Sequence, residues 1–164
     1  MDISKIYFDM DGVLADFDRG VTELCNFPYI PQDKKTPEQD DEMWAAIRKV
    51  EHFYFKLEPM EGALEMFAKI YEKYGSRCEI LTGIPKPKRG IATAGEDKTE
   101  WVHKYLSPDI VVNIVYAQDK KNFCKGKDYV LIDDLKKNTD VWINSGGTGI
   151  LHRSVENTME ILGM

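Results

Sequence analysis

The sequence predicts an α/β fold, a doubly wound parallel sheet with a small helical cap inserted after the first strand. Short apolar runs alternate with amphipathic segments along the chain, which is typical of strands joined by crossover helices. The first run, residues 5–8, is apolar enough to be buried on both faces, as strands of a parallel sheet are. Residues 18–59 form a connection too long for a simple crossover, so they are expected to form an insertion above the sheet edge.

The first half of the chain contains one strand and the segments of the insertion. Phe17, Val21 and Leu24 share one face of a helical period. Closely spaced prolines and charges mark a turn-rich segment after it. The elements expected here are a strand at 5–8, a helix at 16–25, turns at 27–41, a short helix at 42–50 and an aromatic cluster at 53–55.

The second half repeats the alternation of helix and strand. An amphipathic helix expected at 61–74, with Leu64 and Phe67 on its inner face, ends at Gly75. The later elements expected are strands at 78–81, 110–116, 129–132 and 148–151, and helices at 98–106, 136–144 and 155–162. The sequence therefore predicts a core domain of residues 1–17 and 60–164 and a cap of residues 18–59.

The bulk properties exclude several classes of protein. A net charge of −6 argues against a general nucleic-acid surface. No apolar stretch is long enough to span a bilayer, and the start does not resemble a signal peptide. The three cysteines are far apart and form no CxxC pair, and the three histidines lack zinc-ligand spacing. We expect a cytoplasmic protein without a nucleic-acid polymer or membrane partner, and a homodimer stays open.

Two aspartates and a glycine follow the first strand directly. Asp9 and Asp11 would repel each other unless a cation or a shared proton lay between them. Gly12 allows a sharp turn close to a ligand. The pattern suits Mg²⁺, with one carboxylate free to attack or to carry a proton. A calcium loop is the alternative, but Asp16 and Asp18 do not fit its ligand spacing.

Polar residues end two further strands. Thr82 follows one apolar run, and Asp133 with Asp134 follows another. Taken singly, the threonine could begin a turn and the acidic pair could cap a helix. Because the carboxyl ends of parallel strands meet along one edge, we expect these side chains to converge with Asp9 and Asp11. Together they would form an acidic, metal-capable cluster with a hydroxyl donor.

The segment DMDGVLADF, residues 9–17, resembles the first motif of the haloacid dehalogenase (HAD) superfamily of phosphohydrolases, whose core is a Rossmann-type sheet. The resemblance implies that Asp9 is a nucleophile that attacks phosphorus and that Asp11 is the general acid/base. The order of the later motifs also agrees. On this resemblance Thr82 and the amide of Gly83 would bind the phosphoryl group.

The same resemblance implies a Mg²⁺ site formed by Asp9, Asp11, Asp133 and Asp134. Asp11 would contribute its backbone carbonyl and Asp134 a direct carboxylate ligand, whereas Asp133 would act through water or orient the site.

Phosphoryl transfer also needs a fixed cation near the transferred group. Lys120 is favoured by motif order, Lys86 is expected as a second phosphate contact, and Lys98 is held in reserve.

Longer stretches resemble one branch of the superfamily, the 5′(3′)-deoxyribonucleotidases. They are residues 9–17, 53–62, 80–86, 97–109 and 118–134. This resemblance implies hydrolysis of nucleoside monophosphates, with Phe17 and Tyr54 on the cap side of the substrate pocket.

The chain also departs from that branch. Gly83 stands where serine is frequent, and residues 27–41 lack a clear equivalent of the aromatic pair in the family's cap. These departures leave base and sugar preference open. The main expectation is a Mg²⁺-dependent phosphomonoesterase that uses an aspartyl-phosphate intermediate. The alternatives are a phosphatase for a sugar phosphate or other small phosphomonoester, and a catalytically silent ligand-binding module on the same fold.

Overall fold

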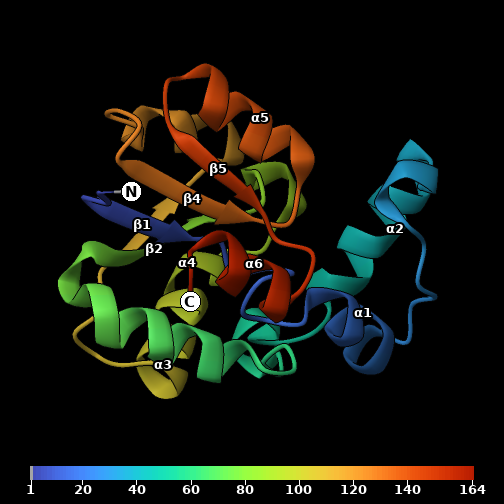
Figure 1. Cartoon of the computed structure of the whole chain (residues 1–164). Helices are drawn as coiled ribbons and strands as arrows, with labels where there is room; N and C mark the ends of the chain where they lie inside the picture. Colours follow the sequence, from blue (N-terminus) through green and yellow to red (C-terminus); the bar gives the residue numbers. More distant parts are fainter. Residues whose placement is uncertain (1) are drawn as a thin grey trace.

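Five parallel strands form one sheet in the order β3-β2-β1-β4-β5 (Figure 1). The computed structural model describes residues 2–164, so Met1 of the predicted core lies outside the described residues. The strands are β1 (Lys5–Phe8), β2 (Cys78–Gly83), β3 (Val112–Val115), β4 (Tyr129–Asp133) and β5 (Thr148–Leu151). The chain winds outward from β1 to β2 and β3 on one side and to β4 and β5 on the other. The predicted doubly wound parallel sheet is confirmed.

Helices cover both faces of this sheet because successive strand side chains point to opposite faces. Ile6 and Phe8 of β1 belong to the larger hydrophobic core, whereas Tyr7 packs with Trp142 in a smaller core on the other face. The larger core lies under α3 (Ala63–Tyr74), α4 (Ala94–Tyr105) and α6 (Val155–Ile161), and the smaller core under α5 (Lys136–Asn144) and the 3₁₀ helix η5 (Ala117–Phe123) (Figure 1).

The segment between β1 and α3 lies beyond the carboxyl ends of the strands, where α1 and α2 stand apart from the sheet layers (Figure 1). Its elements are α1 (Phe17–Cys25), η1 (Gln32–Lys34), α2 (Pro37–Arg48) and η2 (Phe53–Lys56). The prediction of turns throughout 27–41 is wrong from Pro37 onward. Thr36 and Gln39 form a reciprocal capping box and Pro37 occupies the first helical turn, so α2 begins five residues earlier than expected.

The next difference concerns the loop after β2. It contains the short 3₁₀ helix η4 (Pro87–Arg89), and α4 begins at Ala94 rather than at residue 98. Lys98 therefore lies inside a formed helix rather than at its start. The helix at 136–144 and the strand at 148–151 agree with the sequence prediction. Within residues 2–164, no helix combines the length and apolar character needed to cross a membrane.

Candidate active site

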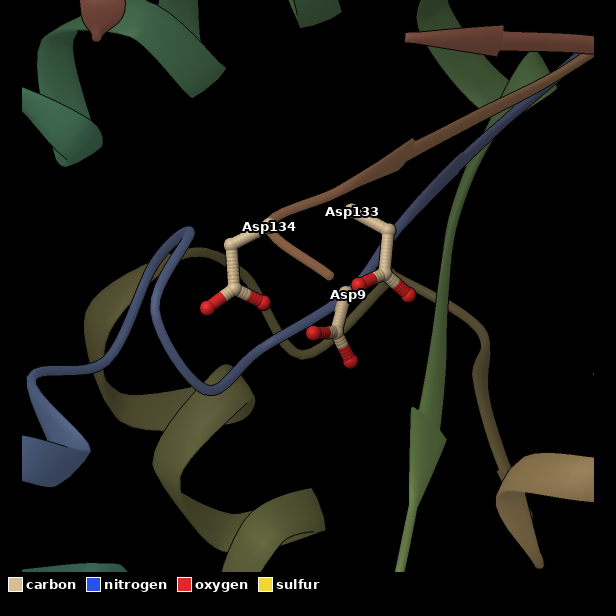
Figure 2. A group of neighbouring side chains, drawn as sticks. All are labelled: Asp9, Asp133 and Asp134. Atoms are coloured by element: carbon tan, nitrogen blue, oxygen red, sulfur yellow. The ribbon is translucent and has the colours of Figure 1, made fainter. Parts of the chain in front are cut away.

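Three strands end at the same edge of the sheet and carry polar side chains there. Asp9 follows β1, and its amide donates to the carbonyl oxygen of Ile132 on β4 at 2.9 Å. Figure 2 shows the carboxyl groups of Asp9, Asp133 and Asp134 pointing into the same space. Each of the three carboxylates offers an oxygen within 4.8 Å of the others. The topology thus brings together acidic groups that are more than a hundred residues apart in sequence.

Gly12 makes this arrangement sterically accessible. Its φ is +83°, in the left-handed region that favours glycine. A Cβ atom at this position would lie only 2.0 Å from Oδ2 of Asp134. The turn is tight because the amides of Val13, Leu14 and Ala15 all donate to the carbonyl oxygen of Met10. The glycine is therefore required both by the turn and by the close approach of Asp134.

Lys98 is fully buried and uses all three of its N–H donors. Its Nζ donates to Asp11 Oδ2 at 3.1 Å, to Thr82 Oγ1 at 2.8 Å and to the Gly83 carbonyl oxygen at 2.8 Å. The same ammonium lies 4.6 Å from the centroid of the Tyr54 ring. Because the Thr82 hydroxyl accepts from Lys98, its own proton is free to be donated elsewhere. Lys98 thus fixes Asp11 and orients Thr82 without a donor left for a ligand.

Lys120 plays a different part. Its Nζ donates to Asp9 Oδ1 and to Asp133 Oδ2, each at 2.9 Å. The third N–H of its ammonium group is therefore free to donate to a ligand. Burial alone would lower the pKa of Lys120, but Asp9 and Asp133 outweigh it and raise the pKa above its usual range. The lysine is therefore a fixed cation beside Asp9. It lines the cavity in which the carboxylates lie.

The two aspartates at the end of β4 have different surroundings. Asp133 accepts from the Leu135 amide at 2.9 Å, from Asn138 Nδ2 at 3.0 Å and from Lys120, so both of its oxygens are engaged. By contrast, no side chain among the described residues donates a hydrogen bond to the Asp134 carboxylate. Burial, followed by repulsion from Asp9, raises the pKa of Asp133 to about 6 and that of Asp134 to about 8. A bound cation would relieve this repulsion.

These residues fit Mg²⁺, which prefers hard carboxylate oxygens. Asp9 and Asp134 offer oxygens that could bind it directly, whereas the hydrogen bonds of Asp133 suit an orienting role. Oδ1 of Asp11 is buried without a hydrogen-bond partner among the described residues. Burial raises the pKa of the Asp11 carboxyl group despite the opposing effect of Lys98. Asp11 is therefore suited to carry a proton near the carboxylate cluster.

A cavity of about 480 Å³ opens above the cluster, between the sheet edge and the inserted segment. Phe17 and Tyr54 line it, with their ring centroids 6.3 Å apart in a stacked arrangement. Trp44 and Tyr29 also line it, and sequence reasoning missed both of them. For Trp44, the available signal in the sequence was a tryptophan on the helix predicted at 42–50. A larger groove of about 1540 Å³ between α3 and α6 is lined by none of the three clustered aspartates.

Lys86 does not line the carboxylate cavity, so the structure does not group it with this cluster, and its role as a second phosphate contact stays a prediction. It is exposed and lines a neighbouring hollow of about 300 Å³ instead of the carboxylate cavity. The physical reason is local, since the backbone is extended at Lys86 and then enters η4. Lys98, the third lysine considered, contacts Asp11 and Thr82. Asn138, which supports Asp133, was not anticipated from the sequence.

Known proteins resemble this chain in sequence. Human mitochondrial 5′(3′)-deoxyribonucleotidase is 27% identical over 132 residues, covering 71% of this chain and 57% of the relative. The human cytosolic-type 5′(3′)-deoxyribonucleotidase is 26% identical over 132 residues, covering 71% of this chain and 64% of the relative. The chain thus matches about three fifths of the length of these relatives.

Solved structures share the fold. A HAD-hydrolase from Bacillus subtilis, bound to magnesium, matches with a TM-score of 0.63 and 12% identity, covering 100% of both chains. A haloacid dehalogenase-like family protein from Streptococcus pneumoniae matches with a TM-score of 0.60 and 11% identity, covering 90% of this chain and 83% of that chain. The sequence model of one family, described as 5′ nucleotidase, deoxy (Pyrimidine), cytosolic type C protein, matches residues 3–159. The resemblance seen in the sequence is confirmed, and the chain belongs to this 5′ nucleotidase family on a HAD-type fold.

Proposed function

We propose that the protein is a Mg²⁺-dependent phosphomonoesterase, a 5′(3′)-deoxyribonucleotidase that dephosphorylates nucleoside monophosphates. The observation that carries the proposal is the position of Asp9. Asp9 is only 7% exposed, its carboxylate lies 2.9 Å from Lys120 Nζ, and it shares a space with Asp134. The position suits a carboxylate nucleophile that Lys120 holds in place. Family membership supports the substrate class.

The covalent step begins at Asp9. One carboxylate oxygen accepts from Lys120, and we assign the other to attack phosphorus in line. A new bond forms between this oxygen and phosphorus while the bond from phosphorus to the leaving oxygen breaks. Asp11 gives its proton to the departing alcohol oxygen. Asp11 then takes a proton from a water molecule that attacks the aspartyl-phosphate, which releases phosphate and restores Asp9.

The phosphoryl oxygens carry the charge that the site must stabilise. We assign their contacts to the free N–H of Lys120, the Thr82 hydroxyl and the amide of Gly83. Mg²⁺ held by Asp9 and Asp134 would neutralise the carboxylates and the phosphate. Residues 18–59 would act as a cap that excludes water and contacts the leaving group through Tyr54, together with Phe17 at the end of the preceding core segment. A cytoplasmic location remains a prediction from the sequence, and a homodimer stays open.

Removing Lys98 should impair the acid/base step. We expect Lys98→Met to lower kcat by about 10²-fold or more, because Asp11 and Thr82 lose their common donor. The rate of phosphate release at saturating substrate measures this effect. Lys104→Met, at an exposed position on the same helix, is the matched control and should retain kcat within about twofold. Equal kcat in Lys98→Met and wild type would show that Lys98 does not position Asp11.

Asp134 should govern the response to Mg²⁺. We expect Asp134→Ala to raise the Mg²⁺ concentration for half-maximal activity by about tenfold or more, since a direct carboxylate ligand is lost. A Mg²⁺ titration of activity measures the shift. Asp140→Ala, which removes an exposed carboxylate from α5, is the control and should leave the titration unchanged. An unchanged titration in Asp134→Ala would exclude Asp134 from the metal site.

The substrate class is tested with a panel of phosphate esters. It contains deoxyribo- and ribonucleoside 5′- and 3′-monophosphates and several sugar phosphates, each assayed with Mg²⁺ and with EDTA. We expect Mg²⁺-dependent phosphate release that favours the deoxynucleotides. Release from sugar phosphates alone would support the phosphomonoesterase reaction and contradict the nucleotide as its substrate. Binding of these esters without any release would favour the silent ligand-binding module.

A further inference from the structure

Arg89 connects two parts of the chain that are far apart in sequence. It ends η4 in the loop after β2, and its guanidinium reaches α2 in the inserted segment. Nη1 donates to Asp41 Oδ1 at 2.6 Å, and Nη2 donates to Asp40 Oδ2 at 3.0 Å. The planar guanidinium therefore holds two adjacent carboxylates at once. The side chains of Arg89 and Asp40 are 18% and 29% exposed, so this pair is less screened than a typical surface pair, whereas Asp41 is 69% exposed.

Trp44 lies beside this contact. It lies one helical turn beyond Asp40 and Asp41 on α2, on the neighbouring surface of the helix. Arg89 lies 5.9 Å from the centroid of the Trp44 ring, and the Phe17 ring centroid lies 6.0 Å from it. Trp44 lines both the carboxylate cavity and the neighbouring hollow of about 300 Å³. It therefore forms a wall shared by the two spaces.

A second contact brings the same loop close to α2. Gly90 has a φ of +73°, and a Cβ atom there would lie 2.9 Å from Cδ of Arg48 at the end of α2. The loop therefore meets α2 at Gly90 as well as at Arg89. The same loop begins directly after Thr82 and Gly83 and leads into α4, which carries Lys98. It thus links the expected phosphate-binding residues to the helix that carries Trp44.

Resting on the proposed function, we propose that Arg89 is a positioning residue that fixes Trp44, through Asp40 and Asp41, as the wall against which an aromatic leaving group packs. Arg89 lines the neighbouring hollow but is not among the residues that line the carboxylate cavity. Its removal should therefore weaken the binding of a planar leaving group and leave the chemistry at Asp9 intact. A leaving group without an aromatic ring should not depend on it.

The first test separates binding from chemistry. Arg89→Met keeps the apolar stem and removes the donors. We expect its KM for a deoxynucleoside monophosphate to rise about tenfold, with kcat within about twofold of wild type. The KM for glycerol phosphate should not change. Arg89→Lys should recover part of the loss, and Lys88→Met, an exposed neighbour with the same charge change, should behave as wild type.

The second test identifies the path through α2. Asp40→Asn combined with Asp41→Asn should reproduce the rise in KM that Arg89→Met causes. Adding Arg89→Met to that pair should produce no further rise, because both carboxylates that accept from Arg89 are already lost. Full additivity would show that Arg89 acts by another route and would overturn the proposal.

The third test needs no turnover. Trp101 and Trp142 are buried, so acrylamide quenching of tryptophan fluorescence reports mainly on half-buried Trp44. We expect the quenching constant to rise about twofold in Arg89→Met and not in Lys88→Met. Unchanged quenching, or an equal rise in KM for glycerol phosphate, would overturn the proposal. If wild type hydrolyses no ester, the proposed function fails while quenching still tests the contact between Arg89 and Trp44.

Discussion

Asp9→Asn is expected to lower the rate of phosphate release by at least about 10⁴-fold while the protein stays folded. The amide is nearly isosteric with the carboxylate but cannot form the aspartyl-phosphate. It still offers a carbonyl oxygen to Lys120, which donates to Asp9 Oδ1 at 2.9 Å in wild type. Initial rates with saturating Mg²⁺ and nucleotide measure the loss, and circular dichroism verifies the fold.

Asp128→Asn is the matched control for this variant. It makes the same chemical change at a residue that does not line the carboxylate cavity, and it should keep the wild-type rate. Phosphate release by Asp9→Asn within about tenfold of wild type would contradict a covalent mechanism through Asp9. Loss of the fold in this variant would instead assign Asp9 a structural role.

Gly12→Ala should be the most damaging substitution that removes no functional group. The added Cβ would lie 2.0 Å from Oδ2 of Asp134, and the φ of +83° disfavours any side chain. We expect the half-maximal Mg²⁺ concentration to rise more than about tenfold, because Asp134 must move. The strained backbone should also lower the free energy of unfolding by about 1–2 kcal/mol. Mg²⁺ titration of activity and urea unfolding measure the two effects.

Gly146→Ala separates these two contributions. Gly146 has a φ of +98°, but a Cβ atom there meets nothing within 4 Å. This variant should lose stability through backbone strain alone and keep the wild-type Mg²⁺ titration. If Gly12→Ala and Gly146→Ala have the same Mg²⁺ titration, the close approach of Gly12 to Asp134 has no part in metal binding.

The sequence could predict the sheet and the convergence of the acidic residues. Both depend on local signals and one topological rule, since apolar runs identify parallel strands and parallel strands end at one edge. Asp9, Thr82 and Asp133 could therefore be grouped before any coordinates existed. The start of α2 could also be predicted from the sequence. Thr36 and Gln39 form a capping-box pattern and Pro37 suits the first helical turn, although the prolines and charges nearby favour turns.

The roles of the lysines could not be ranked from the sequence. A lysine carries no local signal of its partners, because its long side chain reaches them across the fold. Lys98 contacts Thr82 only because α4 begins at Ala94 and packs the ammonium inward. Lys86 is closer to Thr82 in sequence, yet the loop leads it to the neighbouring hollow. The role of Trp44 likewise could not be predicted, because it depends on where α2 lies relative to the loop after β2.

The most direct test of the central claim is a rapid acid quench of the enzyme with a ³²P-labelled nucleoside monophosphate and Mg²⁺. We expect protein-bound label on Asp9 that appears before free phosphate and then decays. We also expect more label to accumulate in Asp11→Asn, since Asp11 activates the water that releases the phosphoryl group. Release of phosphate by wild type with no label on either protein at any quench time would contradict nucleophilic attack by Asp9.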